Sequence, residues 1–207
     1  MGAAETSGFG SDVSRETAER FVLLEDLVKK WNPTINLVSR ESIAHIRNRH
    51  IRDSIQLFRI SAFDEGVWCD LGSGGGFPGL VIAILAQELD GPHQVKLVES
   101  DARKAVFLRE AVRHLGVGAT VINARIEETP SVSASTLSAR ALASLSRLCE
   151  FAIRHLSPDG VALFPKGASF QAEVLEARRD WSFDLKVHAS ETDYAAAILE
   201  LRNIRHA

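Results

Sequence analysis

The segment "VWCDLGSGGGFPGLVIAILA", residues 67–86, constrains the fold more than any other part of the chain. A short apolar run at 67–71 is followed by a glycine-rich loop and then by a second apolar run that starts at Leu80. Glycines turn a chain sharply and let a ligand approach the backbone. A helix that begins after such a loop offers unpaired N–H groups. We therefore predict a strand at 67–71, a ligand-binding loop, and a helix from Leu80 to about Glu88.

The same order of strand and helix recurs down the chain. Further strands are expected at 95–99, 119–123, 137–142 and 160–166, with helices at 102–115, 148–156 and 170–179. This alternation is typical of a doubly wound, Rossmann-like α/β sheet of parallel strands. The segments 183–189 and 196–204 lack an intervening helix, so we expect an antiparallel hairpin at one edge of the sheet. In such sheets ligands bind at the carboxyl ends of the strands.

The N-terminal part of the chain has a different character. Residues 1–12 are rich in Gly, Ser and Ala and are expected to form a disordered tail. Residues 13–62 are expected to form a helical extension, and residues 63–207 the α/β domain. The first helix of the extension should end at Asn32, because a residue before proline avoids the α region. A second helix is expected from about Arg40 to Phe58.

Composition excludes several classes of protein. Apolar residues make up 45% and charged residues 25%, which is typical of a soluble globular domain. The net charge is -3, whereas proteins that coat nucleic acid are usually basic, so a contact with RNA requires a local basic patch. The two cysteines lack partners at metal-ligand spacing, so we expect no metal site and a reducing, cytoplasmic environment. The apolar run "GLVIAILA" is too short to span a membrane.

The glycines of the loop can be read in two registers. Gly72, Gly74 and Gly76 form G-x-G-x-G, whereas Gly74, Gly76 and Gly79 form the G-x-G-x-x-G fingerprint of dinucleotide-binding proteins. The second register makes an NAD-type oxidoreductase the main alternative. Asp70, just before the first glycine, argues against a pyrophosphate and favours a cation. S-adenosylmethionine carries a sulfonium and an ammonium but no phosphate, so it suits the loop better.

Polar residues also follow the next two strands. Glu99 ends the second strand and can accept from both hydroxyls of a ribose, as in NAD and S-adenosylmethionine sites alike. "NARIEE" follows the third strand, where the backbone N–H of Ile126 or Glu127 can meet an adenine ring. Phe77 either forms a wall of the pocket or packs the helix. This joint placement at successive strand ends is more specific than any one residue.

Several stretches together resemble the bacterial ribosomal RNA small subunit methyltransferase G family, also called the glucose-inhibited division protein B family. They are "WNPTINLVSRES", "RHIRDSIQL", "DLGSGGGFPGL", "LVESDARKAVFLREA", "ARIEE", "SARALASL" and "FPKG". The resemblance implies a class I methyltransferase fold with seven strands, S-adenosylmethionine as cofactor, and methylation of N7 of one guanine in the decoding-region loop of 16S ribosomal RNA. It also implies cofactor contacts at Gly72, Phe77, Ile126, Glu127 and Arg140, with Glu99 near the ribose. A cofactor-binding module without catalysis remains a further alternative.

Basic residues indicate where the RNA, either free or within the 30S particle, would bind. The candidates are Arg40, Arg47, Arg49 and Arg52 in "RESIAHIRNRHIRDS", and Lys166 at the end of strand five. Arginine suits phosphate well, but a solvated helix face with an Arg49–Asp53 pair is also possible. We expect a monomer.

Arg140 follows the fourth strand in "SARA", where adenine-N6 methyltransferases would carry an Asn/Asp-Pro-Pro-Tyr-like sequence. The N7 atom of guanine has a lone pair and no proton, so no general base is needed, and the rate depends on alignment. Arg140 can bind guanine O6, a phosphate or the methionine moiety, and the sequence does not choose between these.

Overall fold

The structure is a computed structural model that describes Phe9 and residues 13–207. The prediction of a disordered tail at 1–12 therefore falls, apart from Phe9, outside the described residues. Phe9 itself is buried against Phe21, with ring centroids 5.2 Å apart. The helices are α1 (Arg15–Ile35), α2 (Arg40–Ile43), α3 (Asp53–Ser61), α4 (Gly79–Leu85), α5 (Ala102–Leu115), α6 (Leu145–His155) and α7 (Phe170–Ala177), with a π-helical turn at Arg47–Arg52 and a 3-10 turn at Ala86–Glu88.

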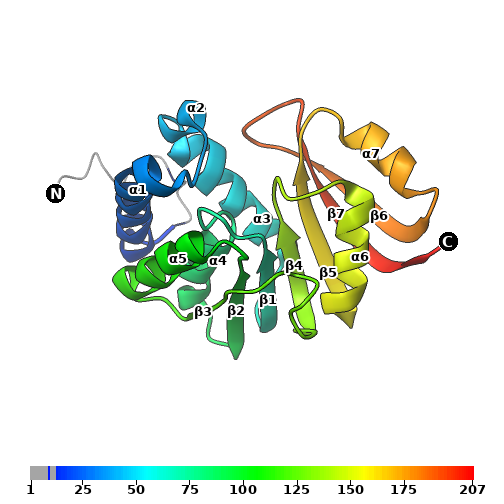
Figure 1. The fold of residues 1–207 in the computed structure, drawn as a ribbon, viewed down its shortest axis with the longest axis horizontal. Helices are drawn as coiled ribbons and strands as arrows, with labels where there is room; N and C mark the ends of the chain where they lie inside the picture. The colour runs from blue at the N-terminus through cyan, green and yellow to red at the C-terminus, as the bar shows by residue number, and fades with distance from the viewer. Residues whose placement is uncertain (1–8, 10–12) are drawn as a thin grey trace.

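One mixed sheet of seven strands forms the centre of the molecule (Figure 1). Its strands are β1 (Gly66–Leu71), β2 (His93–Val98), β3 (Ala119–Ile122), β4 (Ala134–Ala139), β5 (Leu156–Lys166), β6 (Trp181–Ala189) and β7 (Ala197–His206). They are arranged in the order β3-β2-β1-β4-β5-β7-β6. The first five pair in parallel, and β7 is antiparallel to both β5 and β6. The predicted doubly wound sheet with an antiparallel hairpin at one edge is confirmed.

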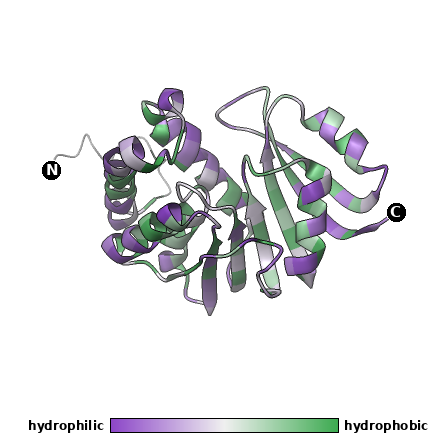
Figure 2. Cartoon of the chain, viewed as in Figure 1, coloured by the Kyte–Doolittle hydropathy of each residue, from purple (hydrophilic) through white to green (hydrophobic). Residues whose placement is uncertain are grey.

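Successive strand residues point into two different cores. Trp68 packs with the helices α1, α3, α4 and α5, whereas Cys69 packs on the opposite face with α6. The same alternation separates Leu163 from Phe164 on β5. Figure 2 shows apolar residues concentrated on the central strands β4 and β5 and polar residues on the outer helix surfaces. Two-sided burial explains why the parallel strands read as nearly continuous apolar runs.

The first helix is longer than predicted. It continues through Pro33 and ends at Ile35, although proline cannot donate a backbone hydrogen bond. Two contacts stabilise this end: Asn36, in a left-handed conformation, donates its N–H to the Asn32 carbonyl at 2.9 Å. The side chain of Asn32 accepts from the Val38 N–H at 2.8 Å. The local preference of the residue before proline is therefore overridden.

The second predicted helix is also different, because it is divided. Ser39 caps the short α2, and a π-helical turn at Arg47–Arg52 leads directly into α3. Single π-helical turns occur frequently at functional sites. Here the turn carries His50, and α3 starts with Asp53, so both side chains face the carboxyl end of β4, where Arg140 lies.

Candidate functional site

Three adjoining cavities lie at the carboxyl ends of the parallel strands. The Glu99 cavity of about 420 Å³ is bounded by Gly72, Glu99 and Ile126. The glycine-loop cavity of about 620 Å³ lies between that loop and the π-helical turn. The Pro165 cavity of about 560 Å³ lies between the ends of β4 and β5 and the loop that joins β6 to β7. Arg140 and Ala141 contribute to the lining of all three, so the cavities form one cleft.

The glycine loop has the conformation that its sequence requires. Gly72, Gly74 and Gly76 have φ values of 67°, 50° and 88°, which residues other than glycine rarely adopt. The N–H of Ser73 donates to the Val98 carbonyl at 3.0 Å, which ties the loop to β2. Gly72 and Gly74 line both the Glu99 cavity and the glycine-loop cavity. Gly76 lies outside the lining of the three cavities.

Asp70 requires a correction, because its side chain does not face the cleft. It is only 1% exposed and lies beneath the loop, outside the lining of the three cavities. Its carboxylate accepts from the Gly79 N–H at 3.2 Å and from the Ser138 hydroxyl at 2.8 Å. Burial raises the pKa of Asp70 to about 6. Asp70 therefore connects β1, β4 and the start of α4 rather than contacting a cation directly.

Gly79 is explained by packing. A Cβ atom at this position would lie 2.3 Å from Leu97 Cδ2 and 2.7 Å from Asp70 Oδ2. Helix α4 thus approaches the sheet so closely that only glycine fits at its first residue. The last glycine of the G-x-G-x-x-G register consequently has a structural function that needs no dinucleotide.

Glu99, the predicted ribose-binding residue, lines the Glu99 cavity and is fixed by two backbone contacts. Its side chain is 7% exposed, and its two oxygens accept from the Gly74 N–H at 2.8 Å and the Asp101 N–H at 2.7 Å. A carboxylate offers about four lone-pair sites, so two remain for a pair of ligand hydroxyls. The same interactions fix the glycine loop and the start of α5 relative to each other.

Ile126 and Glu127, predicted to lie beside the adenine of a cofactor, also line the Glu99 cavity. The Ile126 carbonyl contacts Nε2 of the buried His155 at 3.1 Å, which anchors this loop to α6. Glu127 is paired with Arg147 at 2.6 Å. A hydrogen bond with its own backbone and this arginine lower the pKa of Glu127. The loop is therefore held by two contacts with α6, one at the buried His155 and one at Arg147, which also lines the cavity.

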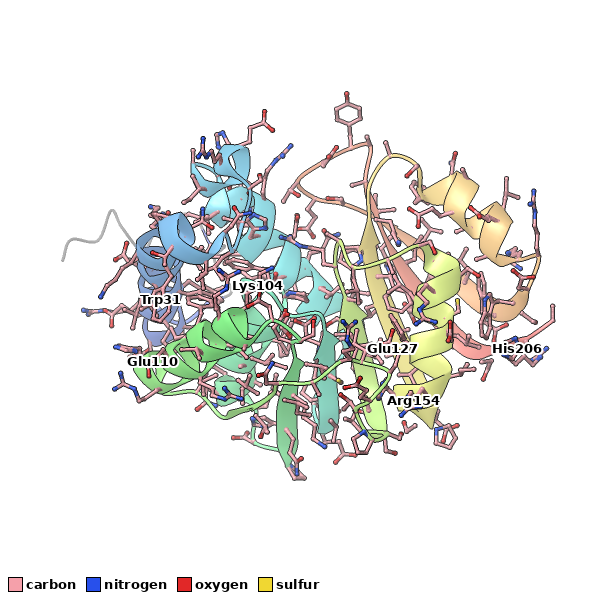
Figure 3. The ribbon with its side chains drawn as sticks, viewed as in Figure 1. Trp31, Lys104, Glu110, Glu127, Arg154 and His206 are labelled. Carbon is pink, nitrogen blue, oxygen red and sulfur yellow. The ribbon has the colours of Figure 1, made fainter. Side chains whose placement is uncertain are left out.

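Sequence reasoning missed other members of this wall. They are Lys104, Arg125, Leu142, Arg147 and Phe151. Figure 3 shows Lys104 and Glu127 near the middle of the molecule, whereas Glu110 and His206 lie at its opposite ends. The position of Lys104 in the first turn of α5, after the capping residue Asp101, was a usable signal, since that turn starts at the carboxyl end of β2.

Phe77 belongs both to the cleft and to the core. It is 6% exposed, lines the glycine-loop cavity, and packs in the same core cluster as α4. Its ring stacks on that of His50, with centroids 4.9 Å apart and an interplanar angle of 23°. His50 lines the same cavity. Its Nε2 is buried without a hydrogen-bond partner among the described residues.

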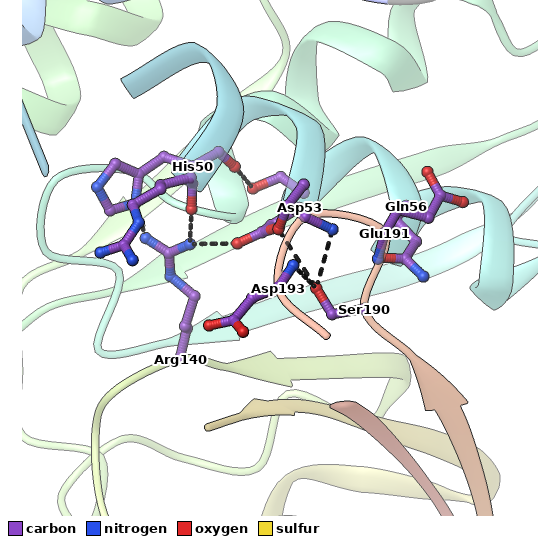
Figure 4. Close-up of polar contacts among 10 residues, drawn as sticks. His50, Asp53, Gln56, Arg140, Ser190, Glu191 and Asp193 are labelled. Atoms are coloured by element: carbon purple, nitrogen blue, oxygen red, sulfur yellow. Dashed lines mark hydrogen bonds and ion pairs between the residues drawn. The ribbon is translucent and has the colours of Figure 1, made fainter. Parts of the chain in front are cut away.

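Arg140 connects the π-helical turn and α3 to the sheet (Figure 4). Its guanidinium donates to the Arg49 carbonyl at 2.9 Å and to Nδ1 of His50, and lies 3.6 Å from Oδ2 of Asp53. Because a guanidinium only donates, His50 must accept through Nδ1. Burial lowers the pKa of Arg140 to about 10, so the side chain stays cationic at neutral pH.

The predicted RNA-binding residues have different environments. Arg40, Arg49 and Arg52 are exposed, and Arg49 also lines the glycine-loop cavity. Arg47 instead pairs with Glu25 at 3.0 Å and lies over the ring of Phe9. The predicted alternative, an Arg49–Asp53 pair, is replaced by the pair between Arg140 and Asp53.

Lys166 is also occupied within the protein. Its side chain is 10% exposed, and its ammonium donates to Glu173 at 2.7 Å and to the Ala143 carbonyl at 2.8 Å. This arrangement fixes the start of α7 and the loop after β4, and leaves little of the lysine accessible to a phosphate.

Within the described part of the chain, no cluster of three or more His, Cys, Asp or Glu side chains is arranged to hold a metal ion. Among the described helices, none combines the length and the apolar character required to cross a membrane. The cleft combines a glycine loop, the carboxylate of Glu99 and a central arginine.

Solved structures show the same fold at low sequence identity. A methyltransferase from Aquifex aeolicus, described as dependent on S-adenosylmethionine, aligns with a TM-score of 0.60 and 12% identity over 86% of this chain and 97% of that chain. TYW2 from M. jannaschii in complex with AdoMet aligns with a TM-score of 0.56 and 14% identity, over 75% and 77% of the two chains. The fold is therefore that of the S-adenosylmethionine-dependent methyltransferases.

Sequence relatives are much closer. Ribosomal RNA small subunit methyltransferase G of Ruegeria sp. (strain TM1040) is 50% identical over 193 residues, which cover 93% of this chain and 94% of the relative. The protein of the same name from Paracoccus denitrificans (strain Pd 1222) is 50% identical over 94% of this chain and 99% of its own. The model of the GidB family, described as rRNA small subunit methyltransferase G, matches residues 17–201. The chain thus belongs to the rRNA small subunit methyltransferase G family.

Proposed function

We propose that this protein transfers a methyl group from S-adenosylmethionine to N7 of a guanine in small-subunit ribosomal RNA. The single observation that carries the proposal is the Glu99 cavity, where a fixed carboxylate with free lone pairs faces a glycine loop and an apolar wall at Ile126. This arrangement fits an adenosine, with its ribose on Glu99 and its adenine against Ile126. The methionine moiety would extend past Gly72 and Gly74 into the glycine-loop cavity.

Bound S-adenosylmethionine supplies an electrophilic methyl group on a sulfonium. The residues of the protein then have two tasks, which are to hold the target base in line with that methyl group and to exclude water. Nδ1 of His50 already accepts from Arg140, so it is not available as a base. Guanine N7 attacks through a lone pair and loses no proton, so a cleft without an available general base is suited to the reaction.

The two alternatives have less support. A dinucleotide-dependent oxidoreductase would use Gly79 near a pyrophosphate, but Gly79 is accounted for by its contact with Leu97 and Asp70. A module without catalysis would not need the half-buried arginine at the junction of the three cavities. The matched relatives are named as methyltransferases, not as oxidoreductases.

The proposal also covers the RNA partner of the protein and the compartment in which it acts. Arg49 is exposed and lines the glycine-loop cavity. Arg40 and Arg52 are also exposed and are sequence neighbours of the lining residues Ser39 and Asp53. Guanidinium groups suit RNA phosphates. We place the reaction in the cytoplasm, on ribosomal RNA or the 30S particle, with the chain acting as a monomer. Light scattering of the free protein and of its complex with RNA measures the last point.

Cofactor binding is tested by calorimetry with S-adenosylmethionine. Glu99→Gln should weaken binding about tenfold to hundredfold, because hydrogen bonds to a charged acceptor contribute about 1.5–3 kcal/mol. Glu128→Gln is the matched control, since Glu128 makes the same chemical change outside the cavity lining. Absence of S-adenosylmethionine binding by the wild-type protein would refute the proposal.

The base and atom are tested separately. Small-subunit RNA from a strain that lacks the gene is incubated with the protein and labelled S-adenosylmethionine, and N7-methylguanine is mapped by chemical cleavage and primer extension. We expect one methylated guanine. Label at another atom, or in another base, would overturn the assignment to guanine N7.

A further inference from the structure

The Pro165 cavity has no assigned ligand, although it adjoins the cofactor cleft. Its volume of about 560 Å³ is within the range of about 300–1,000 Å³ that is usual for small-molecule sites. Leu142, Pro165 and Ile198 give it apolar surfaces, and Asp53 and Arg140 give it charged groups. A flat ligand with polar edges therefore fits the chemistry of its walls.

Most polar groups of this cavity already have partners. The amide of Gln56 donates to the Ala189 carbonyl at 2.7 Å and accepts from the Glu191 N–H at 3.0 Å. Lys166 and Glu173 form a pair at 2.7 Å. These contacts make the walls rigid and leave fewer groups to select a ligand.

The pair formed by Asp53 and Arg140 is different. Their closest nitrogen and oxygen atoms are 3.6 Å apart, which is longer than a direct hydrogen bond of about 2.7–3.2 Å. The two side chains are 26% and 18% exposed. Each therefore keeps hydrogen-bonding capacity, and side by side they present one donor and one acceptor to the cavity (Figure 4).

The order of these two groups relative to the cofactor cleft matters. Arg140 lines all three cavities, whereas Asp53 lines the Pro165 cavity and the glycine-loop cavity but not the Glu99 cavity. A purine that enters with N7 toward the cofactor presents its C6 substituent to Arg140 and its N1 and C2 groups to Asp53. Guanine offers an acceptor at O6, followed by donors at N1 and N2. Adenine offers a donor at N6 and an acceptor at N1, which is the reverse order.

We propose that the Pro165 cavity receives the target guanine extruded from the RNA, and that Arg140 binds its O6 while Asp53 accepts from N1–H and N2–H. The proposal rests on the proposed function and adds the residues that select the base. Enzymes that modify a base commonly extrude it and recognise its Watson–Crick edge in a pocket. Leu142, Pro165 and Ile198 would contact the faces of the ring.

The surroundings of Asp53 hold it in position for this function. The hydroxyl of Thr192, on the loop between β6 and β7, donates to Oδ1 of Asp53. Oδ2 is the oxygen that lies near Arg140. Gln56 holds the same loop one helical turn further along α3. Because the carboxylate is restrained from both sides, less conformational freedom is lost when a base binds.

The experiment compares two RNA substrates. Small-subunit RNA is assembled by ligation with either guanosine or inosine at the methylated position, since inosine retains O6 and N1–H but lacks the N2 amine. We expect the wild-type kcat/KM to be about tenfold to hundredfold higher for guanosine, the effect of one hydrogen bond to a charged acceptor. In Asp53→Asn this ratio, measured at saturating S-adenosylmethionine, should fall to about threefold or less.

Thr192→Val is the matched control, because it removes the hydroxyl that contacts Asp53 but keeps the carboxylate. It should change kcat/KM for both substrates by the same factor, so that the ratio is preserved. A wild-type ratio near one, measured without any variant, overturns the proposal, as does an unchanged ratio in Asp53→Asn. If Thr192→Val also loses the preference for guanosine over inosine, Asp53 has a purely structural function and the proposal is overturned.

These outcomes are distinct from failure of the proposed function. If the wild-type protein methylates guanosine and inosine substrates equally, only the assignment of Asp53 and the Pro165 cavity is wrong. If it binds S-adenosylmethionine but methylates neither substrate, the proposed function fails and the base assignment fails with it.

Discussion

Replacement of Asp70 by asparagine should change how the stability of the protein depends on pH. Burial is the main reason that the pKa of Asp70 rises from 3.8 to about 6. As the pH falls, the Asp70 carboxyl therefore binds a proton near pH 6 in the native protein but only near pH 4 in the unfolded chain. The contribution of Asp70 to the free energy of unfolding is therefore largest below about pH 4 and decreases as the pH rises from about 4 to about 6. Above about pH 6 the native protein contains a buried charged carboxylate, and its free energy of unfolding is lowered by the full desolvation penalty.

The magnitude follows from the size of the shift. A rise of about 2 pH units at 1.36 kcal/mol per unit corresponds to about 3 kcal/mol. Between about pH 4.5 and about pH 7.5, about 2 kcal/mol of this would be observed. Asparagine has the same shape, so its carbonyl can accept from the Gly79 N–H and its amide can donate to the Ser138 hydroxyl. The variant therefore lacks the titration but keeps the two contacts of Asp70.

The measurement is urea unfolding of both proteins at a series of pH values. Tryptophan fluorescence is a suitable signal, because the indole of Trp68 donates to the Ser138 hydroxyl at 2.9 Å, beside Asp70. Subtracting the unfolding free energy of the variant from that of the wild type removes the titration of all other groups. The difference should fall by about 2 kcal/mol between about pH 4.5 and about pH 7.5. A difference that stays flat or increases with pH would refute the reasoning.

Two further predictions concern packing and reactivity. Gly79→Ala places a Cβ atom 2.3 Å from Leu97 Cδ2 and should lower the free energy of unfolding by about 1–3 kcal/mol in urea denaturation, whereas Gly167→Ala, with open space around it, should have little effect. Equal effects of both substitutions would contradict the close contact. Burial raises the pKa of Cys69 and of Cys149 to about 12, so iodoacetamide at about pH 8 should label neither in the folded protein and both in urea. Rapid labelling of the native protein, read by mass spectrometry, would show that the thiols are accessible.

The sequence by itself determined the order of the strands and helices and much of the ligand-binding edge. Glu99 and Ile126 could be assigned to one site without coordinates because each follows a strand of a parallel sheet, and the carboxyl ends of such strands meet at one edge. The glycine loop was recognisable because its backbone conformation requires glycine at Gly72 and Gly74. These are local patterns, and the topology of the sheet follows from them.

Only the tertiary structure decided which polar groups face one another. Asp70 is adjacent to the loop in sequence, but its side chain points into the protein, where it joins Ser138 on another strand. Arg140 meets His50 and Asp53, which precede it by about ninety residues, because the helical extension packs across the cleft. The period of a pattern shows which face of an element is buried, but the identity of its partners depends on packing between distant segments. For that reason the residues around the glycine loop were largely predictable, and the contacts of Arg140 with His50 and Asp53 were not.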